Sequence, residues 1–183
     1  MQVLVTGPAR SGKSEWAEAI AAQRQGEGQQ VVYVATGVRD PSDAEWQTRI
    51  QQHQQRRPAD WQSLEVPVAL AATIRGAEAN CCLLVDSLGT WLANILEQDE
   101  ATWENTLKDL NHALGQAQGD VILVAEEVGW GVVPSYPIGR LFRDRLGQLT
   151  RTVGAIADET YLVTAGHVLN LSQLGTPLKR SHG

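Results

Sequence analysis

The stretch MQVLVTGPARSGKS, residues 1–14, decides the fold of this chain. Its first part, Gln2 to Thr6, is a short apolar run typical of a buried strand, and the Ala- and Glu-rich segment after Gly12 favours a helix. Between them GPARSGKS (7–14) matches the pattern G-x-x-x-x-G-K-[ST], in which backbone N–H groups cradle phosphate oxygens. This strand–loop–helix unit predicts an α/β fold of the P-loop NTPase type.

Outward from this unit, short apolar runs alternate with longer segments of helical period. The alternation is typical of a mostly parallel central sheet with helices on both faces. Strands are expected at 2–6, 30–35, 61–66, 81–86, 121–125 and 161–164, about five of them in the core, and helices at 11–24, 42–56, 68–75, 88–97, 101–116 and 139–157. We expect one domain over residues 1–168 and a polar tail at 169–183 that frays.

The composition excludes several classes of protein. The 183 residues, 43% of them hydrophobic and 20% charged, match a globular domain rather than a disordered chain. With 15 basic against 21 acidic residues the net charge is -6, which gives no basic footprint for nucleic acid. No apolar run is long enough for a membrane span, and the N-terminus lacks a leader pattern, so we expect a cytoplasmic protein. Cys81 and Cys82, adjacent in an apolar run, are interpreted as core residues.

Within the loop, each residue type has a chemical reason. Lys13 would place a point charge on the terminal phosphates, and Ser14 would offer its hydroxyl to magnesium. Arg10 would add a second cation beside the phosphates or remain a solvated loop charge. The motif predicts a nucleoside triphosphate and magnesium, and it leaves kinase, GTPase, motor and binding module open.

A histidine surrounded by arginines follows in the segment RIQQHQQRRPADW, residues 49–61. Arg49 and His53 are four apart on one face of the expected helix, and Arg56 and Arg57 come just before Pro58 ends it. A neutral imidazole can attack a phosphoryl group, and arginines can bind the phosphate charge during the attack. From these residues alone, a solvated surface histidine is the commoner interpretation.

Taken together, five segments resemble one enzyme family: VLVTGPARSGKS (3–14), VVYVAT (31–36), the segment around His53, LLVDSLGTWLANIL (83–96), and EEVGWGVVP (126–134) followed by RLFRDRLGQLTR (140–151). The chain is similar to the bifunctional adenosylcobinamide kinase and adenosylcobinamide-phosphate guanylyltransferase family of cobalamin assembly. The resemblance covers residues 2–166 and rests most on H-x-x-R-R-P-x-x-W and E-V-G-x-G-x-x-P.

The resemblance implies an activity and its participants. Adenosylcobinamide would be phosphorylated with ATP or GTP, and GMP from GTP would then pass through a guanylylated His53 to give adenosylcobinamide-GDP. Lys13 would be the second catalytic residue, and magnesium would be held by Ser14 and Asp86. A homo-oligomer, by resemblance a ring-like trimer, is also implied. The nucleotide-binding residues implied are Gly7, Pro8, Ala9, Arg10, Ser11, Gly12, Lys13, Ser14, Val34, Ala35, Thr36, Gln54, Gln55, Arg56, Arg57, Glu65 and Asp86.

The two carboxylates in this set have a physical rationale. Guanine presents N1–H and N2–H donors that one carboxylate accepts together, whereas adenine presents an acceptor at N1. The resemblance implies that Glu65 and Asp86 are the carboxylates in contact with guanine. Asp86 also ends an apolar strand, where P-loop enzymes hold magnesium, so guanine contact, magnesium binding and a merely structural role stay open for it.

The sequence departs from the family pattern at a few positions. Pro8 stands where a second glycine is common, and Glu126 and Thr150 stand where the family usually has asparagine. A separate charged patch comprises Arg140, Phe142, Arg143 and Asp144, and it suits an internal ion-pair network, a subunit contact, part of the corrinoid site or a solvated helix face.

Three rival functions remain at this stage. A plain P-loop kinase would leave His53 inert, and a regulatory module would bind GTP without turnover. A family member could also retain guanylyl transfer and have lost the kinase, because one phosphate loop serves both steps. The sequence identifies no general base for either step.

Overall fold

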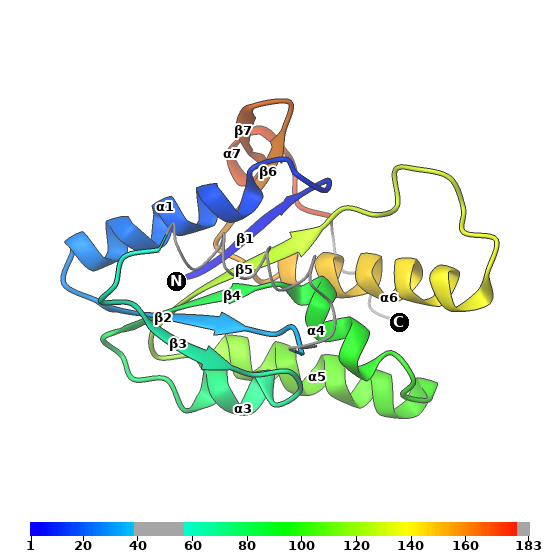
Figure 1. Ribbon diagram of the computed structural model, residues 1–183, viewed down its shortest axis with the longest axis horizontal. Coiled ribbons are helices and arrows are strands. Elements are labelled where there is room, and N and C mark those ends of the chain that lie inside the picture. The colour runs from blue at the N-terminus through cyan, green and yellow to red at the C-terminus, as the bar shows by residue number, and fades with distance from the viewer. Residues whose placement is uncertain (39–56, 179–183) are drawn as a thin grey trace.

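The structure, a computed structural model, describes residues 1–38 and 57–178. Its centre is a single sheet with strand order β3-β2-β4-β5-β1-β6-β7 (Figure 1). Neighbouring strands from β3 to β6 pair in parallel, and β7 pairs antiparallel with β6. The strands are β1 (Gln2–Gly7), β2 (Gln30–Ala35), β3 (Gln62–Glu65), β4 (Cys81–Asp86), β5 (Asp120–Glu126), β6 (Glu159–Thr164) and β7 (His167–Asn170).

Helices cover both faces of the sheet (Figure 1). They are α1 (Lys13–Gly26), α3 (Leu70–Arg75), α4 (Leu88–Ile95), α5 (Glu100–Gln116), α6 (Pro137–Gly154) and α7 (Leu171–Leu174). Helix α1 lies on one face, while α3, α4, α5 and α6 lie on the other. The predicted mostly parallel α/β sheet is thereby confirmed, and so are the predicted strands and helices within the described residues. The expected helix at 42–56 lies outside them.

The side chains of β1 show how the two faces are filled. Val3 and Val5 pack with Ala17 and Ala21 of α1, and Leu4 between them packs into the larger cluster on the other face. This alternation follows from the two-residue period of a strand. The small alanines let α1 lie close to the sheet, directly behind the loop that joins it to β1.

Two tryptophans fill the core of the larger face. Trp91 of α4 and Trp103 of α5 are 2% and 0% exposed. Each indole N–H has an acceptor, the Val68 carbonyl at 2.9 Å and Gln148 Oε1 at 2.7 Å, so burial leaves neither donor unpaired. Both tryptophans are therefore core residues. Cys82 is also fully buried, and burial raises the pKa of its thiol to about 12.

The end of the chain differs from the expected fraying tail. Residues 167–170 form β7, and α7 follows and packs against β6, so the expected boundary after residue 168 falls inside a strand. The turn at Ala165 and Gly166 has φ values of 49° and 73°, the backbone that two-residue hairpins favour. The sheet thus has seven strands, because β3 and β7 extend the expected core at its two edges.

The parallel strands end at one edge of the sheet, and polar residues gather there. Gly7 of β1 pairs with Glu126 of β5, and Ala35 of β2 pairs with both Asp86 of β4 and Glu65 of β3. Open α/β sheets bind ligands outside the carboxyl ends of their strands. In residues 1–38 and 57–178, no helix combines the length and the apolar character that crossing a membrane requires.

Candidate active site

The phosphate loop joins the last residue of β1 to the first residue of α1. A Cβ at Gly7 would lie 2.2 Å from the Val163 carbonyl oxygen, so the loop begins where only glycine fits. Arg10 and Gly12 have φ values of 58° and 92°, both in the left-handed region. Residues of this conformation build the concave rows of N–H groups that bind anions. The strand–loop–helix context that the motif requires is confirmed.

Lys13 is 7% exposed although it carries a charge. Its Nζ donates to the Pro8 carbonyl at 3.3 Å, which holds the ammonium across the loop where a phosphate would lie. The same carbonyl accepts from the Ser11 N–H at 3.3 Å, so Pro8 contributes an acceptor in place of the N–H that proline lacks. Ser14 follows in the first turn of α1 and is half-buried, and Arg10 is exposed.

At the end of β2, Val34 and Thr36 are each 0% exposed. Thr36 Oγ1 donates to the Ser87 carbonyl at 2.7 Å, accepts from the Ser87 N–H at 3.0 Å and contacts the Thr90 hydroxyl. Thr36 therefore fastens the end of β2 to the turn after β4. Ala35, the third candidate at this strand end, is partly exposed. Nucleotide contact by any of them stays a prediction.

Asp86 ends β4 and accepts a hydrogen bond from Tyr33. The Tyr33 hydroxyl lies 3.1 Å from Asp86 Oδ2. Burial, and then the charge of Asp86, raise the pKa of Tyr33 far above its usual range, so the tyrosine stays a neutral donor. The Arg57 guanidinium carbon lies 3.4 Å from the centroid of the Tyr33 ring. Tyr33 thus contacts both Asp86 and Arg57, two of the residues that sequence analysis named as nucleotide-binding candidates.

Glu126 ends β5 and fixes the turn after Asp86 from the other side. Ser87 Oγ donates to Glu126 Oε1 at 2.6 Å, and the Gly89 N–H donates to Oε2 at 3.0 Å. Because α4 begins at Leu88, the carboxylate takes up a free N–H of the first helical turn and complements the helix dipole. The extra carboxylate at this position is therefore a helix cap and does not face solvent.

The next residue, Glu127, contacts the start of the phosphate loop. Its N–H donates to the Gly7 carbonyl at 2.9 Å, and its Oε1 accepts from the Thr6 hydroxyl at 2.7 Å. Thr6 itself is 4% exposed. A carboxylate is thus held beside the first residue of the loop by two contacts with β1.

The residues at this edge suit magnesium. The ion prefers oxygen donors and is usually bound by one or two carboxylates together with substrate phosphates and waters. The Ser14 hydroxyl at the start of α1 and the Asp86 carboxylate at the end of β4 are such donors, on one edge of the sheet with β5 between their strands. The donor set therefore fits the ion.

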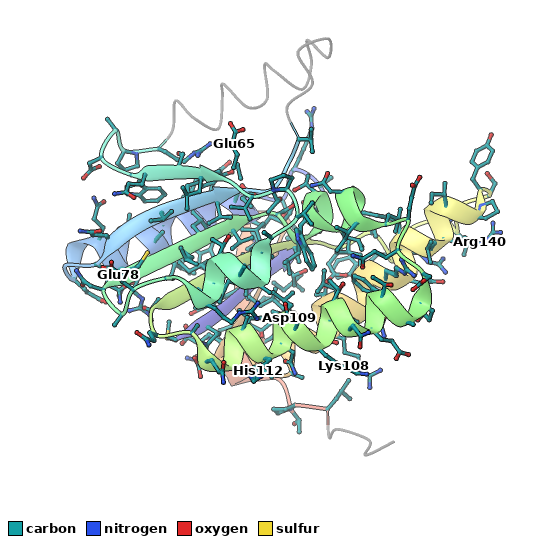
Figure 2. All side chains as sticks on the ribbon, turned by 90° about the horizontal axis from the view of Figure 1, so that it is seen from below. Glu65, Glu78, Lys108, Asp109, His112 and Arg140 are labelled. Carbon is teal, nitrogen blue, oxygen red and sulfur yellow. The ribbon has the colours of Figure 1, made fainter. Side chains whose placement is uncertain are left out.

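Other predicted residues lie apart or outside the described ranges. Glu65 ends the edge strand β3, and its exposed side chain points away from the core (Figure 2). His112 lies on α5 near Lys108 and Asp109, on another side of the molecule (Figure 2). His53 and its neighbours Arg49, Gln54, Gln55 and Arg56 lie outside the described residues.

Comparison with known proteins decides the family. Residues 3–171 match the family described as cobinamide kinase / cobinamide phosphate guanyltransferase. The chain is 41% identical over 180 residues to the bifunctional adenosylcobalamin biosynthesis protein CobP of Pseudomonas aeruginosa, covering 97% of this chain and 100% of the relative. It is 35% identical over 181 residues to CobU of Salmonella typhimurium, with 91% and 97% covered. The chain belongs to the cobinamide kinase / cobinamide phosphate guanyltransferase family. The resemblance stated from the sequence is confirmed.

Solved structures of low identity show the fold of this cobinamide kinase family member. One solved ATPase domain superposes with a TM-score of 0.50 at 12% identity, covering 88% of this chain and 68% of that one. An ATPase of the type III secretion system of pathogenic bacteria superposes with a TM-score of 0.53 at 13% identity, covering 94% and 52%. The P-loop NTPase type of fold is thereby confirmed.

The charged patch on α6 divides into two parts in this family member. Arg140 Nη1 donates to the carbonyls of Pro134 and Ser135 at 3.0 and 2.7 Å, and so fixes the segment before the helix (Figure 2). Arg143 pairs with its neighbour Asp144 at 2.9 Å on the surface. Arg140 thus bonds to backbone carbonyls, and the one ion pair of the patch among the described residues is the surface pair of Arg143 and Asp144.

Sequence reasoning missed three contributors to the site: Thr6, Tyr33 and Ser87. Each lies inside or next to a strand that was correctly predicted, and each bonds to a carboxylate at least 39 residues away in the chain. The one usable signal is position, because a polar residue within a run of buried strand residues needs a hydrogen-bond partner.

Proposed function

We propose that this chain phosphorylates adenosylcobinamide with ATP or GTP and then transfers GMP from GTP to the product, giving adenosylcobinamide-GDP. The observation that carries the proposal is the phosphate loop with Lys13 folded over it, at the start of a family match that spans residues 3–171. The names of both relatives described above, which call them bifunctional and assign them to adenosylcobalamin biosynthesis, support it.

In the phosphoryl transfer, the loop binds and orients the phosphates. The acceptor hydroxyl oxygen attacks the γ-phosphorus, the bond to the bridging oxygen breaks, and the nucleoside diphosphate leaves. Backbone N–H groups of residues 7–14 and the N-terminus of α1 stabilise the phosphate charge, and Lys13 adds a cation at the terminal phosphates. Ser14 and Asp86 would hold magnesium with the nucleotide, and the ion would further neutralise that charge.

In the guanylyl transfer, His53 attacks the α-phosphorus of GTP, a phosphorus–nitrogen bond forms, and pyrophosphate leaves. The phosphate of the corrinoid then attacks the same phosphorus and takes GMP, which frees the histidine. Arg56 and Arg57 bind phosphate charge during the transfer, and Asp86 or Glu65 accepts the guanine N1–H and N2–H donors. The stacking of Arg57 on the Tyr33 ring, beside Asp86, supports a shared location for these two residues.

The remaining proposals concern assembly and location. A homo-oligomer, and specifically a trimer, is proposed from the resemblance. Nucleic acid is not proposed as a partner, since the net charge of -6 provides no general attraction to phosphates. The cytoplasmic location expected from the sequence stays a prediction.

The experiment is a product analysis of the corrinoid by mass spectrometry. Purified protein is incubated with magnesium and adenosylcobinamide, first with ATP and then with GTP added, beside the variants Lys13→Ala and Lys108→Ala. Lys108 lies on α5 with an exposed side chain, so its variant controls for the loss of a charge. We expect the phosphate and then the GDP product from the wild type and from Lys108→Ala, and neither product from Lys13→Ala.

Other outcomes identify the rivals. Phosphorylation that never proceeds to the GDP product would indicate the plain kinase. Transfer of GMP to supplied adenosylcobinamide phosphate, without phosphorylation of adenosylcobinamide, would indicate a member that has lost the kinase. Binding of GTP without any product would indicate the regulatory module.

A further inference from the structure

Two adjacent carboxylates, Glu126 at the end of β5 and Glu127 just after it, lie beside the phosphate loop, and their hydrogen bonds differ. Glu126 uses both oxygens, since Oε1 accepts from Ser87 Oγ at 2.6 Å and Oε2 accepts from the Gly89 N–H at 3.0 Å. A carboxylate bonded in this way is a structural group, because receiving a proton would cost at least one of these bonds.

Among the described residues, Glu127 accepts a hydrogen bond through one oxygen alone. Its Oε1 accepts from the Thr6 hydroxyl at 2.7 Å, and among the described residues none donates a hydrogen bond to its Oε2. The side chain is half-buried, and Thr6 is 4% exposed, so one oxygen is anchored to a fixed strand while the other has no donor within residues 1–38 and 57–178. This is the arrangement that a proton acceptor needs, namely fixed direction with one lone-pair site available.

Glu127 lies between the phosphate loop, which would bind the phosphate donor, and a segment with exposed apolar side chains. Its N–H bonds to the carbonyl of Gly7, the residue at which the phosphate loop begins. On its other side the chain enters the extended segment between β5 and α6 (Figure 1). That segment and the first turn of α6 expose large apolar side chains, which are Val128, Trp130, Val132, Val133, Tyr136 and Ile138. An acceptor with an apolar body would cover this surface and direct its hydroxyl toward the loop.

We propose that Glu127 is the general base of the phosphoryl transfer, an inference that rests on the proposed kinase activity. As the acceptor oxygen forms its bond to the γ-phosphorus and the bond to the bridging oxygen breaks, the hydroxyl proton passes to Glu127 Oε2. The nucleoside diphosphate leaves, and the proton is later released to water. Carboxylates take the hydroxyl proton in this way in protein kinases. Thr6 is the positioning residue that aims the carboxylate.

The test separates the two half-reactions in the full-length protein. Glu127→Gln keeps the shape and the Thr6 bond while it removes the proton acceptor. We expect kcat of the ATP-dependent phosphorylation to fall about 100-fold or more. The KM for ATP and the formation of the GTP-dependent covalent guanylyl adduct should remain as in the wild type, because neither needs the hydroxyl proton.

Two further variants separate the loss of the proton acceptor from the loss of a negative charge. Glu126→Gln removes the same charge one residue away, and its loss of kcat should be far smaller than that of Glu127→Gln. Glu127→Asp keeps a carboxylate and should restore part of the lost kcat. An unchanged kcat in Glu127→Gln would overturn the inference about Glu127 and leave the proposed kinase activity standing. A parallel loss of nucleotide binding and adduct formation in this variant would do the same, because it indicates a structural role. A wild type without any kinase activity would overturn both the inference and the proposed kinase.

Discussion

At the scale of the residue, the lack of a side chain at Gly89 leaves the space that the Glu126 carboxylate occupies. A Cβ at Gly89 would lie 2.1 Å from Glu126 Oε2, so alanine there forces the carboxylate to move and to lose its bonds to Ser87 and to the Gly89 N–H. We expect Gly89→Ala to lower the free energy of unfolding by about 1–2 kcal/mol, although alanine is the better helix former. Urea denaturation measures the change.

Gly147→Ala is the matched control for this prediction. Gly147 lies within α6, and a Cβ there would meet no atom within 4 Å, so this substitution should leave stability unchanged or raise it by about 0.5–1 kcal/mol. A stabilised Gly89→Ala variant would contradict the contact between Gly89 and Glu126.

How far the sequence predicts the site also differs from residue to residue. Lys13 and Ser14 were found because the motif that defines them spans eight consecutive positions. The bonds of Thr6 to Glu127 and of Tyr33 to Asp86 join residues 121 and 53 positions apart. Such pairs depend on the order of strands in the sheet, and the sequence has no local signal for that order. Sequence analysis noted Glu126 only as a departure from the family pattern, because its bonds to Ser87 and Gly89 depend on the same order of strands.

At the scale of the element, one arginine joins three helices. Arg145 of α6 is 5% exposed, donates to the Leu96 carbonyl at the end of α4 at 2.9 Å, and contacts Glu100 of α5 at 3.3 Å. Its guanidinium also lies 5.2 Å from the centroid of the Trp103 ring. The segment connecting α4 to α5 is therefore held to α6 through this side chain.

Truncation of this side chain should be costly. We expect Arg145→Ala to lower the free energy of unfolding by about 2 kcal/mol, because a half-buried carbonyl loses its charged donor and the packing on Trp103 is lost. The exposed Arg151 of the same helix supplies the control, and its alanine variant should change stability by less than about 0.5 kcal/mol. Equal effects of the two variants in thermal or urea unfolding would refute the interpretation.

Elements themselves were predictable where the pattern is long. The strand and helix periods of 81–86 and 101–116 gave β4 and α5 almost to the residue. The hairpin of β6 and β7 was missed because a two-residue Ala165–Gly166 turn is a weaker signal than the polar composition of the segment after it.

At the scale of the whole molecule, most of the exposed large apolar residues of the described chain fall into two dissimilar groups. One lies in the segment between β5 and α6, and the other lies at the end of the described chain and comprises Val168, Leu169, Leu171, Leu174 and Leu178. Large exposed apolar surfaces are uncommon on monomers, and contact between unlike surfaces of identical subunits gives a ring where the rotation between subunits closes. We expect light scattering on the eluted protein to give three times the chain mass of 19.9 kDa. A monomer mass at micromolar concentration would contradict the trimer.

The central claim is that this P-loop protein carries GMP on His53, and intact-mass spectrometry tests it most directly. The protein is incubated with magnesium and GTP without corrinoid, beside His53→Ala and the control His112→Ala. We predict an acid-labile gain of one guanylyl group in the wild type and in His112→Ala, none in His53→Ala, and none when ATP replaces GTP. A folded wild type that binds GTP and gains no mass, or a His53→Ala variant that still gains it, would contradict the account.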